Sequence, residues 1–304
     1  MAHELDRVIE AFASRPWAIE PTRGAEIAAL LALRHARGPR AEPYREDGGP
    51  GAGLENEPRG RVAVLSLHAA IVPRASAVKD ASTPFVAMDR FTRTFTQLAE
   101  DRGVGAIVLD IDSPGGMIDL VPEAAALVAD KRREGRPIYA VANTMMCSAA
   151  YWIGCQADRV FATPSGLVGS IGVRAMHMDH SQKLKRDGIQ VTHLFAAPRK
   201  AEGNPHSPLD GVARAALQDE IDRAYGRFVA VVAATRGVPE AVVRADPEKA
   251  ERHMGGGRAY DAERALALGM IDEIATLDAV IGMATRAGQP RRSVAAERAR
   301  LALG

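Results

Sequence analysis

The feature that most constrains the fold is an alternation of short apolar segments with longer helix-like segments, which begins after Arg61. Apolar residues dominate 62–65, 106–111 and 138–142, and each of these segments is predicted to be a buried strand. The segments between them carry apolar residues at helical spacing, as Phe91 and Phe95 do. Strands separated by helices of this length are typical of βαβ units. We therefore expect an α/β fold with a largely parallel sheet.

The pattern continues toward the C-terminus. Further strands are expected near Val160, at 171–176 and at 191–195. A long amphipathic helix with Leu217, Ile221 and Phe228 follows, and then a helix–strand unit at 262–274.

The sequence divides into four parts. Residues 1–37 are expected to be an N-terminal helical segment, interrupted at Arg15-Pro16. Residues 38–60 contain six glycines and four prolines, which predicts a flexible linker. The alternating pattern occupies residues 61–287 and defines the main domain. Residues 288–304 form a basic tail with four arginines.

Composition excludes several functional classes. The 304 residues carry a formal net charge of +1, so a field suited to nucleic acid is not expected. Two cysteines cannot form a disulfide framework, which favours a reducing cytoplasm. No secretion signal is expected at the N-terminus. The uncharged stretch 137–157 is interrupted by polar residues, so we expect a strand and a helix start rather than a membrane anchor. The eight histidines form no metal set, and no metal is expected.

The first candidate site is the turn 112–116, with the sequence Asp-Ser-Pro-Gly-Gly, at the end of a predicted strand. Two glycines allow the backbone to approach a ligand closely. The N-terminus of the following helix favours negative charge. Taken alone, the turn is better interpreted as an ordinary strand-to-helix connection.

The second candidate is Ser148, which follows the strand 138–142 and precedes the small residue Ala149. A serine at a helix start can act as a nucleophile, and the N–H of Ala149 can face the same oxygen. The alternative is that Ser148 is an N-cap. Cys147 is the rival nucleophile, and we interpret it as a small buried core residue.

The third candidate is Lys200, in the loop 199–205. A lone loop lysine is usually a solvated charge. Were this lysine to deprotonate a serine, it would have to be neutral, and therefore buried and free of a carboxylate partner. Glu202, two positions away, would then have to point elsewhere.

Together these motifs resemble the signal peptide peptidase A family of serine peptidases, and more closely its bacteriophage branch of protein C-like head peptidases. The resemblance covers about residues 61–287. The motifs that carry it, in order, are Asp112-Ser-Pro-Gly-Gly116, Ser148-Ala-Ala-Tyr-Trp152, Pro164-Ser-Gly-Leu-Val-Gly-Ser-Ile-Gly172, Lys200-Ala-Glu-Gly-Asn-Pro205, Gly257-Arg258 and Ala265-Leu-Ala-Leu-Gly-Met-Ile-Asp272. The segment 15–19, Arg-Pro-Trp-Ala-Ile, is also similar to the start of phage members.

The resemblance implies a crotonase/Clp-protease-like ββα spiral and a Ser–Lys dyad that needs no cofactor. The roles it implies are the following: Ser148 as nucleophile, Lys200 as general base, Ser170 as the residue that holds the lysine amine, Gly116 and Ala149 as oxyanion hole, and Gly115 and Asn204 as loop-shaping residues. Two positions depart from the family pattern. Ala69 stands where a glycine is usual, and Ala197-Pro198 replaces Gly-Lys before the base, which bears on how Lys200 approaches the site.

The resemblance also implies partners. The dyad residues of this family come from adjacent subunits or repeats, so we expect a homo-oligomer with composite active sites. The phage-like features predict a cytoplasmic or prohead-associated endopeptidase that cleaves phage scaffold or capsid polypeptides. The alternatives are a housekeeping peptidase for signal-peptide or membrane-protein remnants, a crotonase-type acyl-CoA enzyme, a Ser–His–Asp triad on the same serine, and a non-catalytic scaffold.

Overall fold

The computed structural model describes residues 16–22, 24, 56–59, 61–74, 85–132 and 136–288. Most of the predicted N-terminal helical segment, of the linker and of the basic tail lies outside these residues. The elements in chain order are β1 (Trp17–Ile19), β2 (Asn56–Arg59), β3 (Val62–His68), β4 (Ala70–Val72), β5 (Phe85–Ala87), α3 (Met88–Glu100), β6 (Ala106–Ser113), β7 (Gly115–Met117), α4 (Val121–Arg132), β8 (Ile138–Cys147), α5 (Ala149–Gly154), β9 (Arg159–Ala162), β10 (Leu167–Gly169), α6 (Ser181–Arg186), α7 (Gly211–Arg236), α8 (Glu240–Arg244), β11 (Ala259–Asp261), α9 (Ala262–Ala267), β12 (Glu273–Ile274) and α10 (Leu277–Ala287).

The strands form two sheets. The larger one has eight strands, with the path β11-β10-β8-β6-β3-β2, while β9 pairs with β8 and β12 pairs with β9. Its central pairs, β3 with β6 and β6 with β8, are parallel. The smaller sheet has the order β1-β7-β4-β5. In β6-β7-α4, a strand of the large sheet leads into a strand of the small sheet and then into a helix, and β3-β4-β5-α3 has the same order with two strands of the small sheet. This order confirms the predicted ββα arrangement and its largely parallel sheet.

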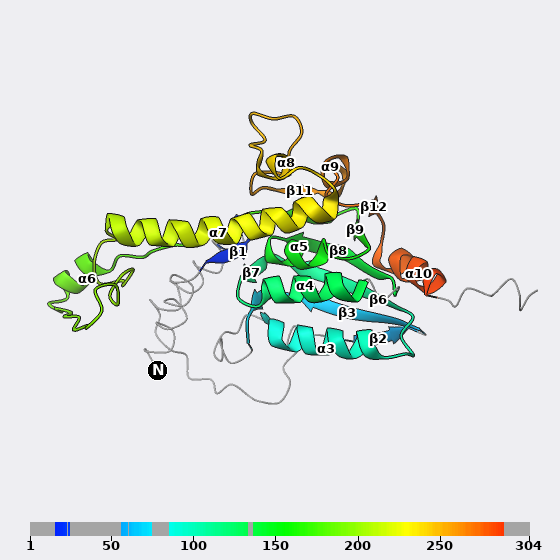
Figure 1. The fold of residues 1–304 in the computed structure, drawn as a ribbon, viewed down its shortest axis with the longest axis horizontal. Coiled ribbons are helices and arrows are strands. Elements are labelled where there is room, and N and C mark those ends of the chain that lie inside the picture. Colours follow the sequence, from blue (N-terminus) through cyan, green and yellow to red (C-terminus); the bar gives the residue numbers. More distant parts are fainter. Residues whose placement is uncertain are drawn as a thin grey trace, which may run out of the picture.

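Helices α3, α4 and α5 lie on one face of the large sheet (Figure 1), and α10 packs against the other face. Successive side chains of a strand point to opposite faces. In β3, Leu65 and Leu67 therefore join the core beneath α3 and α4, while Val62 and Val64 pack with α10 on the other face. The alternation of apolar residues in this strand serves two cores rather than one.

The longest helix, α7, extends beyond the body of the molecule (Figure 1). Its 26 residues span about 39 Å at 1.5 Å per residue. Near its C-terminal end, the ring of Phe228 stacks on Trp152 of α5, with centroids 4.6 Å apart. At its other end lie α6 and the loop that joins α6 to α7. We call residues 177–210 the arm.

Four local predictions differ from the structure. Residues 191–195 form an exposed loop in the arm, where they pair with no strand of the described part of the chain. Residues 171–176 contain one isolated bridge, at Arg174, and the strand in this region is β10. The expected helical segment contains β1, which pairs with β7. The expected linker contains β2, which pairs with β3.

The predicted helix following Ser148 is confirmed as α5, and the predicted helices around Phe91 and Phe228 are confirmed as α3 and α7. None of the helices in the described part of the chain combines the length and the apolar character needed to cross a membrane.

Candidate active site

Ser148 lies at the sharp turn between β8 and α5. Its φ is 56° and its ψ is −119°, and its side chain caps no amide of α5. A positive φ is uncommon for a residue other than glycine, and such strain is concentrated at functional sites. The N-cap interpretation fails because the hydroxyl instead donates to the carbonyl of Gly172, at 3.4 Å. The hydroxyl of Ser148 is therefore not used to cap α5.

The segment that follows β10 wraps around Ser148. The N–H of Ser148 donates to the carbonyl of Gly169 at 2.7 Å, and its hydroxyl reaches Gly172. Between these two contacts lies Ser170, which is buried, has a φ of 53° and donates its N–H to Arg258 at 2.8 Å. The structure thus brings together Ser148 and Ser170, two of the predicted site residues.

Gly115, a predicted loop-shaping residue, and Gly116, a predicted oxyanion-hole residue, are the first two residues of β7. Gly115 has a φ of 94°, which favours glycine. A Cβ on Gly115 would overlap the carbonyl oxygen of Ala18 and would lie 2.9 Å from the nitrogen of Ala149. A Cβ on Gly116 would overlap the carbonyl oxygen of Ile71 in β4. Both glycines are needed for close backbone approach, and they place β7 beside the first residue of α5.

Cys147 is a buried core residue rather than a nucleophile. Burial, with a smaller contribution from the charge of Glu20, raises the pKa of the Cys147 thiol far above its ordinary value. A thiol must ionise to attack, and this one stays protonated. The structure supports the interpretation that Cys147 fills space beneath the site.

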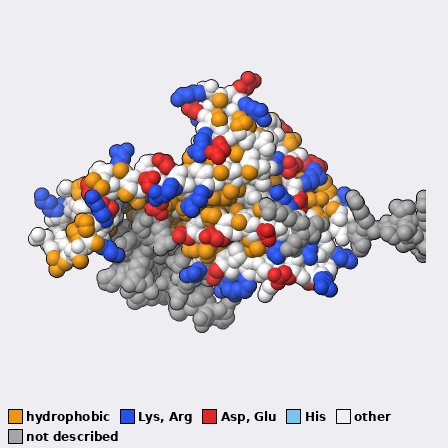
Figure 2. Space-filling view, in the orientation of Figure 1, with side chains coloured by type: hydrophobic (Ala, Val, Ile, Leu, Met, Phe, Trp, Pro, Cys, Tyr) orange, Lys and Arg blue, Asp and Glu red, His pale blue; other side chains and the backbone are white. Residues whose placement is uncertain are grey.

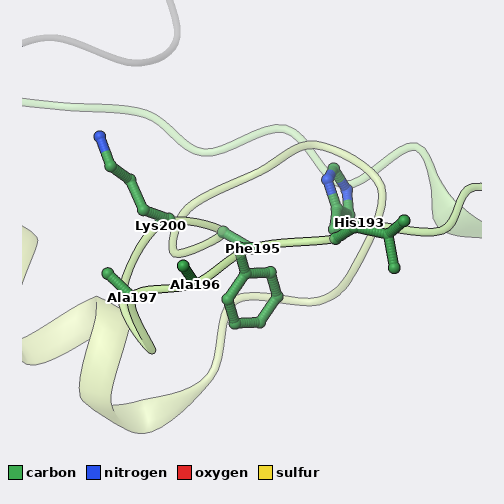
Figure 3. A pocket seen from close by; sticks show the side chains of 7 residues that line it. His193, Phe195, Ala196, Ala197 and Lys200 are labelled. Atoms are coloured by element: carbon green, nitrogen blue, oxygen red, sulfur yellow. The ribbon is translucent and has the colours of Figure 1, made fainter.

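Lys200 is not brought to Ser148 within one chain. It is exposed in the arm, where it lines a shallow hollow together with residues 193–197 and Ala201. Its side chain points away from the rings of His193 and Phe195 (Figure 3). The arm lies at the far end of α7 from α5 (Figure 1). The serine and the lysine are therefore on different parts of the molecule.

The loop around Lys200 is held by its own polar groups. The side-chain amide of Asn204 donates to the carbonyl of Ala201 at 2.6 Å, and its oxygen accepts from the N–H of His206 at 2.9 Å. Glu202 pairs with Arg199 at 2.9 Å. The side chain of Asn204 therefore bridges two parts of this loop, and Glu202, the carboxylate nearest to Lys200 in sequence, is paired with Arg199.

The other candidates from the sequence do not meet at Ser148. No hydrogen bond joins a histidine to Ser148 in the described residues, so the triad alternative has no geometric support. Among these same residues, no three metal-binding side chains converge. Ala69 stands where a glycine is usual in the family that the sequence resembles. Its φ is 82°, a conformation that glycine adopts without strain.

Sequence reasoning missed one part of the site, strand β1. Trp17–Ile19 lies along β7, with Ala18 opposite Gly116. A three-residue strand is too short to show periodicity. The available signal was the similarity of residues 15–19 to phage proteins, which assigned no position to the segment.

Comparisons with known proteins point to one family. The model of peptidase family S49 matches residues 130–289. Capsid assembly protease C of Escherichia phage lambda is 30% identical over 75% of this chain and 50% of its own length. Head-tail preconnector protein GP5 of Enterobacteria phage P21 is 27% identical over 74% of this chain and 43% of its own.

A putative signal peptide peptidase SppA of Enterococcus faecium is 29% identical over 60% of this chain and 51% of its own length. The chain therefore spans about half the length of these curated relatives. Among solved structures, a member of the enoyl-CoA hydratase/isomerase family is similar, with a TM-score of 0.43 and 12% sequence identity. The match covers 78% of this chain and 76% of the chain of that structure. A likeness this distant carries no argument about function. The family model covers just over half of the 304 residues, and the chain belongs to peptidase family S49.

Proposed function

We propose that this protein is a serine endopeptidase in which Ser148 is the nucleophile and Lys200 of another copy is the general base. The observation that carries the proposal is the placement of Ser148. Its hydroxyl is excluded from capping, and it sits on a strained turn next to the glycine strand β7 and the first amide of α5. Such a turn is suited to presenting a nucleophile opposite two backbone donors.

The proposed reaction has two steps. Ser148 Oγ attacks the carbonyl carbon of a peptide bond while its proton passes to the neutral lysine amine. The N–H groups of Gly116 and Ala149 stabilise the oxyanion, and one such donor is worth about 3 kcal/mol. Collapse breaks the C–N bond, and the leaving amine takes the proton from the lysine. Water then hydrolyses the acyl-enzyme, with the lysine again accepting and returning a proton.

The base must be neutral for this chemistry. Lowering the pKa of a lysine from its reference value near 10.4 to ~7 corresponds to about 4.6 kcal/mol. Burial of the amine away from water can lower the pKa by this amount. Lys200 is exposed in the single chain, so the burial must come from elsewhere. We infer that a second copy provides it when the arm of one copy docks near the Ser148 of the next.

The arm has the surface that such docking requires. Leu194 is 94% exposed and Phe195 is 52% exposed, and both border the hollow that Lys200 lines. Hydrophobic side chains gather at the end of the arm in the space-filling view (Figure 2). Exposed apolar groups that cluster in this way mark interaction surfaces. The site would then be composite, and an isolated chain would lack its base.

We propose that the substrates are polypeptides of phage heads, cleaved in the cytoplasm or within the prohead. The relatives from phages lambda and P21 support this assignment. The second candidate is a housekeeping peptidase acting on signal-peptide or membrane-protein remnants, which the similarity to the Enterococcus faecium protein favours.

A covalent probe tests the chemistry. A fluorophosphonate should label Ser148, as read by peptide mapping, and labelling should be lost in Ser148→Ala and retained in Ser181→Ala, a change in the arm. An acyl-CoA enzyme or an inactive scaffold has no reason to react in this way. Labelling that persists in Ser148→Ala, or that never occurs in the wild type, would contradict the proposal.

Co-expression tests the substrate. The protein is expressed with candidate phage scaffold and capsid proteins, and the masses of the intact partners are compared with those obtained with Ser148→Ala. We expect shortened partners with the wild type alone. Unchanged partner masses, together with cleavage of signal-peptide remnants, would favour the housekeeping candidate.

A further inference from the structure

The strand β1 lies between two walls of the candidate active site. On one side it pairs antiparallel with β7, the strand of the two glycines. On the other side Trp17 exchanges two backbone hydrogen bonds with Arg174, at 2.7 and 2.9 Å. Arg174 follows closely on Gly172, whose carbonyl accepts from Ser148. The N-terminal strand therefore fills a slot whose two walls both adjoin the nucleophile.

The register directs one carbonyl of β1 toward the oxyanion donors. In an antiparallel strand, the N–H and C=O of one residue point to the same side, and successive residues alternate. Trp17 faces Arg174, and the N–H of Glu20 donates to Pro114 beside β7, at 2.8 Å. Ala18 therefore faces Gly116, its partner in register.

A second observation places the carbonyl oxygen of Ala18 near Ala149. The Cβ position of Gly115 overlaps that oxygen and lies 2.9 Å from the nitrogen of Ala149. The oxygen of Ala18 is thus close to both residues whose amides we assign to the oxyanion hole. A peptide bound as an added strand would direct the carbonyl of its scissile bond to this same place.

The occupied slot leaves no access to the nucleophile. Ser148 is 0% exposed, and Ala18 and Ile19 are 0% and 3% exposed. A peptide cannot reach Ser148 in this arrangement unless a covering segment moves. The covering segment that lies where a substrate strand would bind is β1.

We propose that Trp17–Ile19 is an internal occupant of the peptide-binding groove, which closes the peptidase until a substrate strand displaces it. This inference rests on the proposed function of Ser148. The occupant belongs to the same chain and is held by backbone pairing and by the burial of its side chains. Activity is then set by an equilibrium between a closed and an open groove.

A reversible crosslink tests the inference in the full-length chain. Trp17 and Met117 are opposite one another, and because Trp17 bonds to Arg174, they form the pair without mutual hydrogen bonds. The Cα atoms of such pairs are about 4.5 Å apart, within the range of about 4.4–6.8 Å for disulfides. The double variant Trp17→Cys/Met117→Cys can therefore lock β1 on β7 when oxidised. Burial raises the pKa of the native thiols Cys147 and Cys155, which makes them poor competitors.

The readout is the rate at which a fluorophosphonate labels Ser148. We expect the oxidised double variant to label at least about tenfold more slowly than the same protein after reduction, because the groove cannot open. The single variant Trp17→Cys, treated with the same oxidant, should label as fast as the reduced protein. Trp17→Ala should label faster than the wild type, whereas Phe95→Ala, a core change in α3, should not.

The outcomes distinguish a failure of this inference from a failure of the proposed function. Equal labelling rates in the oxidised and reduced double variant would overturn the inference and leave Ser148 as the nucleophile. Labelling of Ser148 in none of these proteins would contradict the proposed function, and the inference would fall with it.

Discussion

The N–H of Ser148 donates to the carbonyl of Gly169 at 2.7 Å, which ties Ser148 to the residue before Ser170. Residues that are distant in sequence, at the ends of β8 and β10, are thereby fixed against each other. Strands β8 and β10 pair in parallel up to this point, with Gly169 opposite Cys147. The sheet register itself positions Ser170 at the site.

Under the proposed function, the side chain of Ser170 positions the base and does not bind substrate. Ser170→Ala should therefore lower kcat about tenfold or more while leaving KM nearly unchanged. Losing a hydrogen bond to the neutral amine reduces the fraction of that form, so the pH–activity profile should move to higher pH. Ser170→Thr should restore part of both properties. A variant that loses activity with an unchanged pH profile would argue for a purely structural role.

Gly115→Ala should reduce kcat/KM by about 10²-fold or more, because the new methyl would occupy the space between Ala18 and the amide of Ala149. The matched control is Gly188→Ala, where φ is also positive, at 70°, and nothing lies within 4 Å of the new Cβ. The control carries backbone strain without filling the site. Similar losses in both variants, measured with a peptide substrate, would show that strain alone is responsible.

Leu194→Asp should weaken self-association and activity together without lowering the free energy of unfolding, because this side chain is already 94% exposed. Sedimentation, peptide cleavage and urea unfolding measure the three properties. Leu266→Asp in α9, also an exposed leucine, is the control and should leave association intact. Normal assembly of Leu194→Asp would exclude the end of the arm as the interface.

Asp272 links β9 to the C-terminal end of α7. Its carboxylate accepts from Arg236 at 2.7 Å and from the N–H of Val160 at 2.7 Å. Burial tends to raise the pKa of Asp272, but these hydrogen bonds outweigh it and leave the pKa lowered. Asp272→Ala should therefore cost about 2 kcal/mol of unfolding free energy at pH 7.

The unfolding free energy lost in Asp272→Ala should become smaller as the pH falls. A carboxylate with a lowered folded pKa contributes its stability above the unfolded pKa, near 3.9, and loses it as pH falls through the folded value. The difference between wild type and Asp272→Ala in urea unfolding should therefore shrink below about pH 4. Asp219→Ala, which removes an exposed pair with Arg223, should change little at either pH.

The local parts of the site follow from the sequence because strand, turn and helix signals are themselves local. The end of β8, the turn at Ser148 and the small residue Ala149 are contiguous, and the two adjacent glycines at 115 and 116 are themselves a signal of close backbone approach. The role of Lys200 came from resemblance alone, and one chain does not contain the contact that it would need.

Two failures have a shared physical cause, since strands depend on non-local partners. Residues 191–195 carry apolar side chains typical of a strand, yet in one chain they remain an exposed loop because nothing pairs with them. Conversely, Trp17–Ile19 becomes a strand because β7 and Arg174 offer unpaired edges on both sides. Neither outcome can be predicted from the composition of the segment itself.

The most direct test of the composite site mixes two inactive proteins. Ser148→Ala and Lys200→Ala are each expected to lose peptidase activity, while Lys185→Ala, a change of another lysine in the arm, should retain it. When the two inactive variants are dissociated and assembled together, sites that combine the serine of one copy with the lysine of another should restore a measurable share of wild-type cleavage. A mixture that assembles normally and stays as inactive as its components would contradict the pairing of Ser148 with a neighbour's Lys200.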